Sequence, residues 1–178
     1  NGGQSWYIPD STDFDRIDNL NSVYFTSRNN GYAVGDKGFF IKADNKGRNW
    51  FLKNSFTNKN LNSIFLIDSI NGAVCGDRGS IFISNDACNN WTQKHSSNSY
   101  NLKSIVFVNQ NIGFAAGEST ILKTIDGGNN WSEIYSVNEL NINEIHFINA
   151  DTGFAVGDKA IILNTTNGGN SWDLSSFD

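Results

Sequence analysis

The sequence predicts an all-β fold, a β-propeller built from four-stranded antiparallel blades, and two series of residues lead to this prediction. In each copy of a recurring pattern, one glycine opens a strand phrase and one tryptophan closes the copy. The glycines are Gly31, Gly72, Gly113 and Gly153, and the tryptophans are Trp50, Trp91, Trp131 and Trp172. Both series advance by 40 or 41 residues. At this period a single unit cannot bury its own apolar surface, so neighbouring units must pack side by side.

The first element of each copy is an apolar run, at residues 23–25, 64–67, 105–108 and 145–148. These runs do not alternate cleanly between apolar and polar residues, which is typical of strands that are covered on both faces. We therefore expect them to be the innermost strands. His146 takes the position of Tyr24, Phe65 and Val106 in the other copies, so we expect an uncharged core side chain there.

The next two elements form a hairpin. The phrases GYAVGD, GAVCGD, GFAAGE and GFAVGD consist mostly of small residues, which allow adjacent sheets to approach closely. Turns at 36–38, 77–79, 118–119 and 158–159 then lead into third strands at 39–41, 81–83, 121–122 and 161–163. A fourth strand begins at each tryptophan. Four antiparallel strands in a unit of this length are typical of a propeller blade.

The turn before each tryptophan carries the most specific motif. Thr124, Asp126, Gly128 and Trp131 have the spacing of the Asp-box, or BNR repeat, which this turn resembles. The carboxylate accepts hydrogen bonds from the amides of its own turn, the glycine tolerates a positive φ, and the indole packs between sheets. Across the four copies, the acidic or amide residue and the tryptophan are Asn45 and Trp50, Asp86 and Trp91, Asp126 and Trp131, and Asn167 and Trp172. We expect these residues to be structural.

The Asp-box together with the G-[FY]-A-V-G-D phrase resembles the repeats of the photosystem II assembly and stability factor family and its exported, non-photosynthetic bacterial relatives. The resemblance runs from Asn1 to Trp172. It implies a propeller that binds a protein partner rather than an enzyme. It also implies an extracellular, cell-surface or periplasmic location.

We expect residues 1–178 to form one domain with repeats at about 20–60, 61–101, 102–141 and 142–178. Residues 1–19 would end a preceding blade and link it to the next, with residues 6–8 as the outer strand of a fifth blade. The chain lacks methionine and begins within a phrase, which suggests a processed or excised piece. Further blades outside the chain, or association of two copies through unpaired edges, would complete such an arc.

Composition narrows the class of partner. The net charge is −5 and the 13 basic residues are scattered, so we expect no nucleic-acid partner. No segment reaches the roughly 18 apolar residues of a membrane helix, and the phrases typical of nucleotide, dinucleotide or zinc-protease sites are absent from the sequence. We therefore expect no membrane insertion, no cofactor and no metal.

The topology places the hairpin turns and the links between blades at the end opposite the Asp-boxes, and loops on a rigid scaffold are where binding residues concentrate. The candidate binding residues at this end are Asp36, Lys37, Asp77, Arg78, Glu118, Asp158, Lys159, Phe56 and Tyr100. A protein partner is the first expectation. A glycan stacked on an exposed Phe56 or Tyr100 is the alternative, and a sialidase-like glycoside hydrolase fragment is another. A metal shared by the four acids is disfavoured, because an acid in a Gly-Asp-x-Gly hairpin is a turn residue.

The two cysteines leave two readings open. Cys75 and Cys88 are both departures from the repeat within one unit, which suggests a disulfide. A bridge needs Cα atoms within about 7 Å, and the expected positions are further apart than this, so buried free thiols are the other reading.

Overall fold

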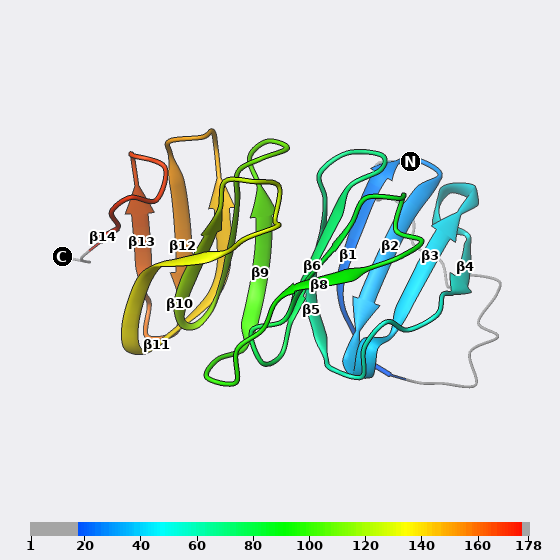
Figure 1. Cartoon of the computed structure of the whole chain (residues 1–178), viewed down its shortest axis with the longest axis horizontal. Coiled ribbons are helices and arrows are strands. Elements are labelled where there is room, and N and C mark those ends of the chain that lie inside the picture. The colour runs from blue at the N-terminus through cyan, green and yellow to red at the C-terminus, as the bar shows by residue number, and fades with distance from the viewer. Residues whose placement is uncertain (1–17, 176–178) are drawn as a thin grey trace.

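The computed structural model describes residues 18–175, apart from the side chains at 45 and 137–139. Three antiparallel sheets stand side by side along the molecule (Figure 1). The first contains β1 (Leu20–Ser27), β2 (Asn30–Gly35), β3 (Phe40–Asp44) and β4 (Asn49–Leu52), in that spatial order. The second contains β5 (Leu61–Leu66), β6 (Gly72–Gly76), β7 (Ile81–Ser84) and β8 (Thr92–His95). Short 3-10 turns at Asp36–Gly38 and Asn45–Gly47 connect strands of the first sheet.

The third sheet has six strands and comprises two repeats. Its strands are β9 (Leu102–Phe107), β10 (Gly113–Thr124), β11 (Ser132–Phe147), β12 (Gly153–Gly157), β13 (Ile162–Thr165) and β14 (Asp173–Leu174). The first part of β11 pairs with β10 and the last part pairs with β12, so one strand serves two repeats. We call the four repeat sheets blades 1 to 4, with β11 divided between blades 3 and 4.

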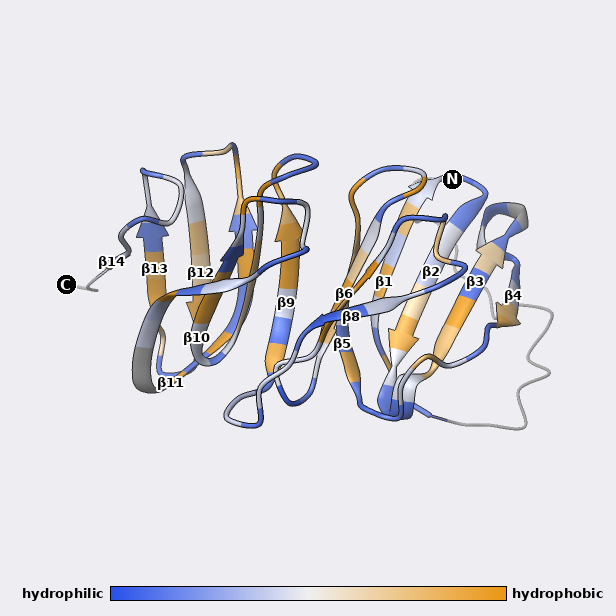
Figure 2. Ribbon diagram, viewed as in Figure 1, coloured by the Kyte–Doolittle hydropathy of each residue, from blue (hydrophilic) through white to orange (hydrophobic). Residues whose placement is uncertain are grey.

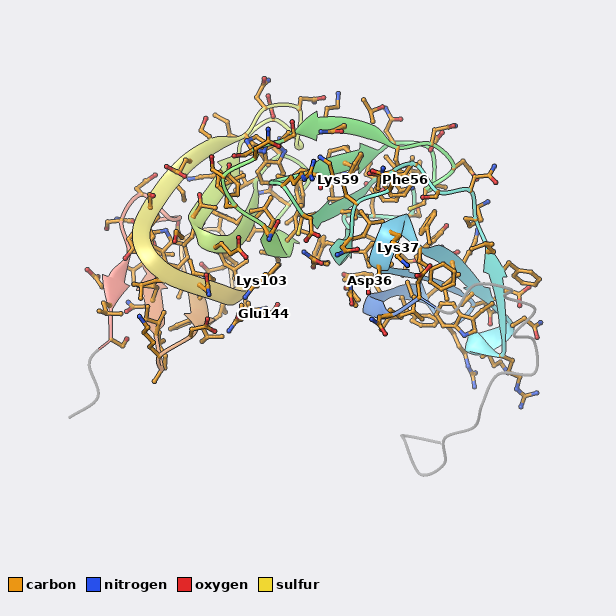
Figure 3. The ribbon with its side chains drawn as sticks, turned by 90° about the horizontal axis from the view of Figure 1, so that it is seen from below. Asp36, Lys37, Phe56, Lys59, Lys103 and Glu144 are labelled. Atoms are coloured by element: carbon orange, nitrogen blue, oxygen red, sulfur yellow. The ribbon has the colours of Figure 1, made fainter. Side chains whose placement is uncertain are left out.

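The blades form a β-propeller arrangement in which each has its first strand nearest the inside of an open arc (Figure 3). The predicted fold class is therefore confirmed. The outer strand expected for a fifth blade, at residues 6–8, lies outside the described residues.

The core lies between blades rather than within any one of them. Hydrophobic residues follow the strands, whereas the connecting loops are mostly hydrophilic (Figure 2). Between blades 1 and 2, side chains from β2 and β3 such as Tyr32 and Phe40 pack against Leu61, Ile64 and Leu66 of β5. Equivalent clusters lie between blades 2 and 3 and between blades 3 and 4. Each blade is thus stabilised by its neighbours, as the repeat period predicts.

The innermost strands differ from the expectation that both of their faces are covered. Along β5, β9 and the last part of β11, the residues that face the preceding blade are buried, and those between them are more exposed, with the exception of the buried Ser104. His146 is exposed, so the expected core histidine is wrong. The reason is that the first strands line the inside of the arc, where one side meets solvent rather than another sheet.

Three of the four Asp-box tryptophans pack in the same way, and the tryptophan of blade 2 packs differently. Trp50, Trp131 and Trp172 each lie edge-on to a phenylalanine at or near the end of the first strand of their own blade, with ring centroids 5.9 Å apart. In blade 2 that phenylalanine is replaced by Leu66. Trp91 instead lies edge-on to Phe40 of blade 1 and stacks on Phe56, with centroids 5.9 and 5.1 Å away respectively. These indoles join the ends of the strands to the core between blades.

The second glycine of each strand phrase has a steric role. A Cβ at Gly35, Gly76, Gly117 or Gly157 would overlap the carbonyl oxygen of the residue that precedes the first strand, namely Asn19, Asn60, Asn101 or Asn141. The next amide along the chain donates a hydrogen bond to that same carbonyl, at 2.9–3.0 Å in all four blades. The hairpin turn is therefore held against the start of the first strand, and only glycine leaves room for this approach.

Both cysteines are buried free thiols, which decides between the two readings left open above. Cys75 faces the core between blades 2 and 3, and Cys88 faces the core between blades 1 and 2. Because the two side chains point to opposite faces of blade 2, they do not meet.

Candidate binding face

The blades have two ends that differ in their hydrogen bonding. At one end, which we call the Asp-box face, each Asp-box turn lies beside the turn between the first and second strands of its blade. In blade 2, for example, the Ala87 amide of the Asp-box donates a hydrogen bond to the Ile70 carbonyl at 2.8 Å. At the other end, the hairpin turns meet the links between blades. The Ser97 amide, for example, donates to the Arg78 carbonyl at 2.8 Å. We call this end the loop face.

On the Asp-box face the turn carboxylates are occupied by their own turns. Asp86 accepts from the Asn90 amide at 2.9 Å and from the Asn90 side chain at 2.7 Å, and the Ser84 hydroxyl donates to it at 2.9 Å. These bonds, led by the Asn90 amide, lower the pKa of Asp86 to about 2. Asp126 is bonded in the same way by Asn130, and its pKa is also lowered, chiefly by the Asn130 side chain. In blade 4, Asn167 accepts from the Ser171 amide at 3.0 Å.

On the loop face the four predicted acids occupy equivalent hairpin positions and bond to asparagines. Asp36 accepts from the side chains of Asn19 and Asn21 at 2.8 and 3.0 Å. Asp158 accepts from those of Asn141 and Asn143 at 2.8 and 2.9 Å, and these bonds lower its pKa, the Asn143 bond most.

The acids of the two middle blades are held in the same way. Asp77 accepts from Asn62 at 3.2 Å, and Glu118 accepts from the amide and the side chain of Asn101 at 2.9 and 3.1 Å. Each acid thus fixes the turn of its own blade. Within the described residues, no group of three or more acids, histidines and cysteines is arranged to hold a metal ion.

Three of these acids are followed by an exposed basic residue. The main chains of Lys37, Arg78 and Lys159 have φ values of 51°, 55° and 57°, and all three residues are exposed. The amides of Lys37 and Arg78 donate to Asn60 and Asn101 of the next blade, at 2.9 Å in both cases. The Lys37 ammonium also lies 3.1 Å from a carboxylate oxygen of Asp18. The loop face therefore presents cationic side chains around carboxylates that already accept hydrogen bonds.

The two predicted aromatic residues do not form exposed platforms. Phe56 is half-buried and packs against Phe40, Phe82 and Trp91 in the core between blades 1 and 2. The expectation that it is exposed is wrong, because its link folds back over the blade edge. Tyr100 is also half-buried, stacks on the His95 ring, and has a raised pKa through burial. Each ring therefore already has one face stacked on another ring.

The inside of the arc contains a groove of about 620 Å³ that the sequence analysis did not identify. The first strands of all four blades line it, and we call it the hub groove. Tyr24, Phe65, Val106 and His146 contribute one side chain each from equivalent positions. The rings of Tyr24 and Phe65 lie 5.1 Å apart and are tilted by 58°. The groove wall is thus partly aromatic, on a rigid sheet scaffold.

The mouth of the hub groove lies on the loop face, because Asn21, Asn62 and Asn143 both line the groove and hold the turn acids. Asn21 and Asn62 also donate to the Leu61 and Leu102 carbonyls of the next blade, at 3.0 and 2.7 Å. In blades 1 and 2, one asparagine therefore connects a turn acid, the groove wall and the neighbouring blade.

The hub groove has two charged side chains, one in blade 3 and one in blade 4, at positions where the other blades have uncharged residues (Figure 3). Lys103 stands where the other blades have asparagine, and its ammonium donates to the side-chain oxygen of Asn143 at 2.7 Å. Glu144 stands where the other blades have serine, and it accepts from the Ser104 hydroxyl at 3.0 Å. Comparing equivalent positions of the first strands would have revealed both departures from sequence alone.

No helix in the part of the chain that the structure describes is long and apolar enough to cross a membrane.

The repeated four-stranded sheets and the recurring hydroxyl, carboxylate and tryptophan turn define the class of protein: an Asp-box β-propeller. The chain belongs to the family described as photosynthesis system II assembly factor YCF48, which matches residues 43–141, more than half of its length. The family resemblance stated from the repeat phrases is therefore confirmed. No curated protein sequence matches the chain.

Solved structures with this fold include both assembly factors and enzymes. YCF48 from Cyanidioschyzon merolae aligns with a TM-score of 0.69 and 20% identity, covering 85% of this chain and 52% of that one. A YCF48 bound to a D1 peptide aligns with a TM-score of 0.58 and 11% identity, covering 89% and 82%. An ancestral GH74 enzyme aligns with a TM-score of 0.75 and 19% identity, covering 89% and 24%. At these identities the likeness shows the fold alone. The chain spans 52% of the length of the first of these structures.

Proposed function

We propose that this chain is a non-catalytic binding module that holds an extended segment of a protein partner in the hub groove and across the loop face. The observation that carries the proposal is the hub groove itself, with its partly aromatic wall and its mouth among the basic residues of the loop face. A YCF48 of the same fold bound to a D1 peptide supports a peptide ligand for this fold.

The residues of the groove and its mouth indicate which side chains a partner segment would carry. Tyr24, Phe65 and Val106 would receive apolar side chains, which gain free energy by leaving water. The exposed basic side chains of Lys37 and Arg78 would attract acidic side chains at the mouth. We therefore propose a partner segment that combines apolar and acidic residues, and binding that weakens as salt concentration rises.

A glycoside hydrolase is the competing function, favoured by the GH74 enzymes among the structural neighbours. Hydrolysis by the usual mechanism needs two carboxyl groups flanking the scissile bond. Among the described residues that line the hub groove, Glu144 carries the single carboxyl group. This supports binding without catalysis.

Selection of phage-displayed random peptides on the immobilised chain tests the proposal. We expect enriched peptides that contain acidic and aromatic residues and that bind at least about tenfold more weakly to the Tyr24→Ser and Lys103→Glu variants. The control is Ile125→Ser, because Ile125 is an exposed hydrophobic residue on the Asp-box face. Failure to enrich any peptide, or equal losses with Ile125→Ser, would refute the proposal. Hydrolysis of xyloglucan by the chain, abolished by Glu144→Gln, would establish the enzyme instead.

We also propose that the module acts outside the cytoplasm, as the exported relatives suggest. Fractionation of the native host, with detection of the chain by antibody, tests this location. Recovery in the cytoplasmic fraction alone would contradict it.

A further inference from the structure

A second cleft, of about 340 Å³, lies on the Asp-box face between blades 2 and 3. One side is formed by the third and fourth strands of blade 2, and the other by the first turn and the Asp-box of blade 3. None of its lining residues lines the hub groove. We call it the amide cleft, because five of its ten lining residues are carboxamides, namely Asn71, Asn85, Gln110, Asn111 and Asn129.

The amide cleft lies where blade 2 departs from blades 1 and 3. In those two blades an aromatic residue follows the glycine that opens the strand phrase, and the ammonium of a third-strand lysine lies over its ring. The pairs are Lys42 over Tyr32 and Lys123 over Phe114, at 5.3 and 5.6 Å from the ring centroids. Blade 2 has Ala73 and Ile83 at these positions, opposite each other in the hairpin. This smaller pair leaves space beside the next blade.

The same two departures remove a hydrogen bond between blades. The Ala87 carbonyl in the Asp-box of blade 2 accepts from the Tyr32 hydroxyl of blade 1 at 3.1 Å. The Gly168 carbonyl in the Asp-box of blade 4 accepts from the Lys123 ammonium of blade 3 at 2.7 Å. Gly127 is the equivalent residue of blade 3 and lines the amide cleft, and its carbonyl accepts no hydrogen bond from the described residues. A bound molecule can therefore supply the donor that blade 2 lacks.

Three polar side chains of the amide cleft are available to a ligand. Asn85, Asn111 and Lys94 are exposed, and none of their side chains makes a hydrogen bond or ion pair with another described residue. Each carboxamide offers both a donor and an acceptor, and the ammonium offers donors. Ile67 and Ile83, both half-buried, add an apolar surface. The cleft thus combines free donors and acceptors with a hydrophobic patch.

We propose that the amide cleft binds one unit of a saccharide. Sugar hydroxyls both donate and accept, as the carboxamides of the cleft do, so each can pair with the other. One hydroxyl would donate to the Gly127 carbonyl, and the C–H face of the sugar ring would cover Ile67 and Ile83.

An amine is the other donor that the Gly127 carbonyl could accept, as it is in blade 4. The charge of Lys94 opposes a cationic ligand, and no carboxylate is among the described residues that line the cleft to offset it. The saccharide proposal does not depend on the proposed protein partner, because the amide cleft and the hub groove share no lining residue.

Screening the labelled chain on an array of neutral and acidic oligosaccharides, followed by calorimetric titration with the best ligand, tests the proposal. Asn85→Ala and Asn111→Ala each remove a side chain that bonds to no other described residue, so they should leave the fold intact and weaken binding about fivefold or more. Gln93→Ala is the matched control. Gln93 is exposed and lies between Thr92 and Lys94 on β8, but it does not line the cleft.

Ile83→Lys restores the lysine that blades 1 and 3 have at this position. Its side chain would occupy the cleft and donate to the Gly127 carbonyl, as Lys123 does to Gly168, so binding should weaken at least about tenfold. Circular dichroism shows whether this variant folds, and the two asparagine variants decide the matter if it does not.

Four results would overturn the proposal. They are an array on which no oligosaccharide binds, unchanged affinity in the asparagine variants, and equal loss with Gln93→Ala. The fourth is tighter binding of putrescine than of any saccharide, which would assign the cleft to an amine. Loss of saccharide binding with Tyr24→Ser but not with Asn85→Ala would place the sugar in the hub groove instead, and would equally refute the amide cleft as its site.

Discussion

Leu20 and Leu61 occupy the same repeat position, yet Leu20 is 50% exposed and Leu61 is 0% exposed. Truncating both to alanine therefore measures what packing between blades contributes at one position, with chemistry and strand context held constant. Leu61→Ala removes three buried carbons and leaves a cavity between blades 1 and 2, which costs about 3 kcal/mol of unfolding free energy. Leu20→Ala removes carbons that are half in water already and leaves no enclosed cavity, so we expect about 1 kcal/mol or less.

Urea unfolding followed by circular dichroism gives both values. Leu102→Ala is the control, because Leu102 is also 0% exposed and should behave like Leu61. Equal losses from Leu20→Ala and Leu61→Ala would refute the reasoning, since they would mean that Leu20 is covered as fully as Leu61.

Three further predictions follow from the turns and the thiols. Gly76→Ala would press a methyl group onto the Asn60 carbonyl, and we expect it to lower the unfolding free energy by about 3 kcal/mol; a loss under about 1 kcal/mol would show that the turn relaxes freely. The lowered pKa of Asp126 means that its charge stabilises the fold above the unfolded value of about 4, and that this contribution is lost as pH falls through the folded pKa. Asp126→Asn should therefore be less stable than the parent at pH 7, with a gap that shrinks as pH falls below 4, and a gap independent of pH would contradict the assignment. Burial raises the pKa of the Cys75 thiol and raises that of Cys88 to about 12, so neither should react with Ellman's reagent until urea unfolds the chain; one reactive thiol in the folded protein, or a disulfide in the unreduced protein, would count against this.

Much of the fold could be predicted because each repeat has the same short-range sequence pattern in its turns and strands. The Asp-box turns use residues within four positions of one another, so their hydrogen bonds depend on local sequence. The requirement for the second glycine also arises within one repeat, since this glycine meets the residue that starts the same blade. Four copies in register made the blade, its strand order and the two ends of each blade predictable.

The candidate site was only partly predictable, because the sequence of one repeat does not show which residues of different blades lie close together. The acids of the loop face were placed on the correct end, but the asparagines that hold them and the hub groove beside them depend on how first strands converge. Phe56 was expected to be exposed because it lies in a link, whereas the core between blades 1 and 2 encloses it. Which face of a link turns inward is decided by the neighbouring blade.

The sequence by itself thus determined the class of fold, the blade topology and the turn chemistry, all of which depend on period and on short-range contacts. Only the tertiary structure decided which apolar side chains are covered. Leu20 and Leu61 show the reason: the same residue at the same repeat position is half exposed in one blade and buried in the next. Burial in a propeller depends on whether a neighbouring blade is present, and that is a property of the assembled arc rather than of the repeat.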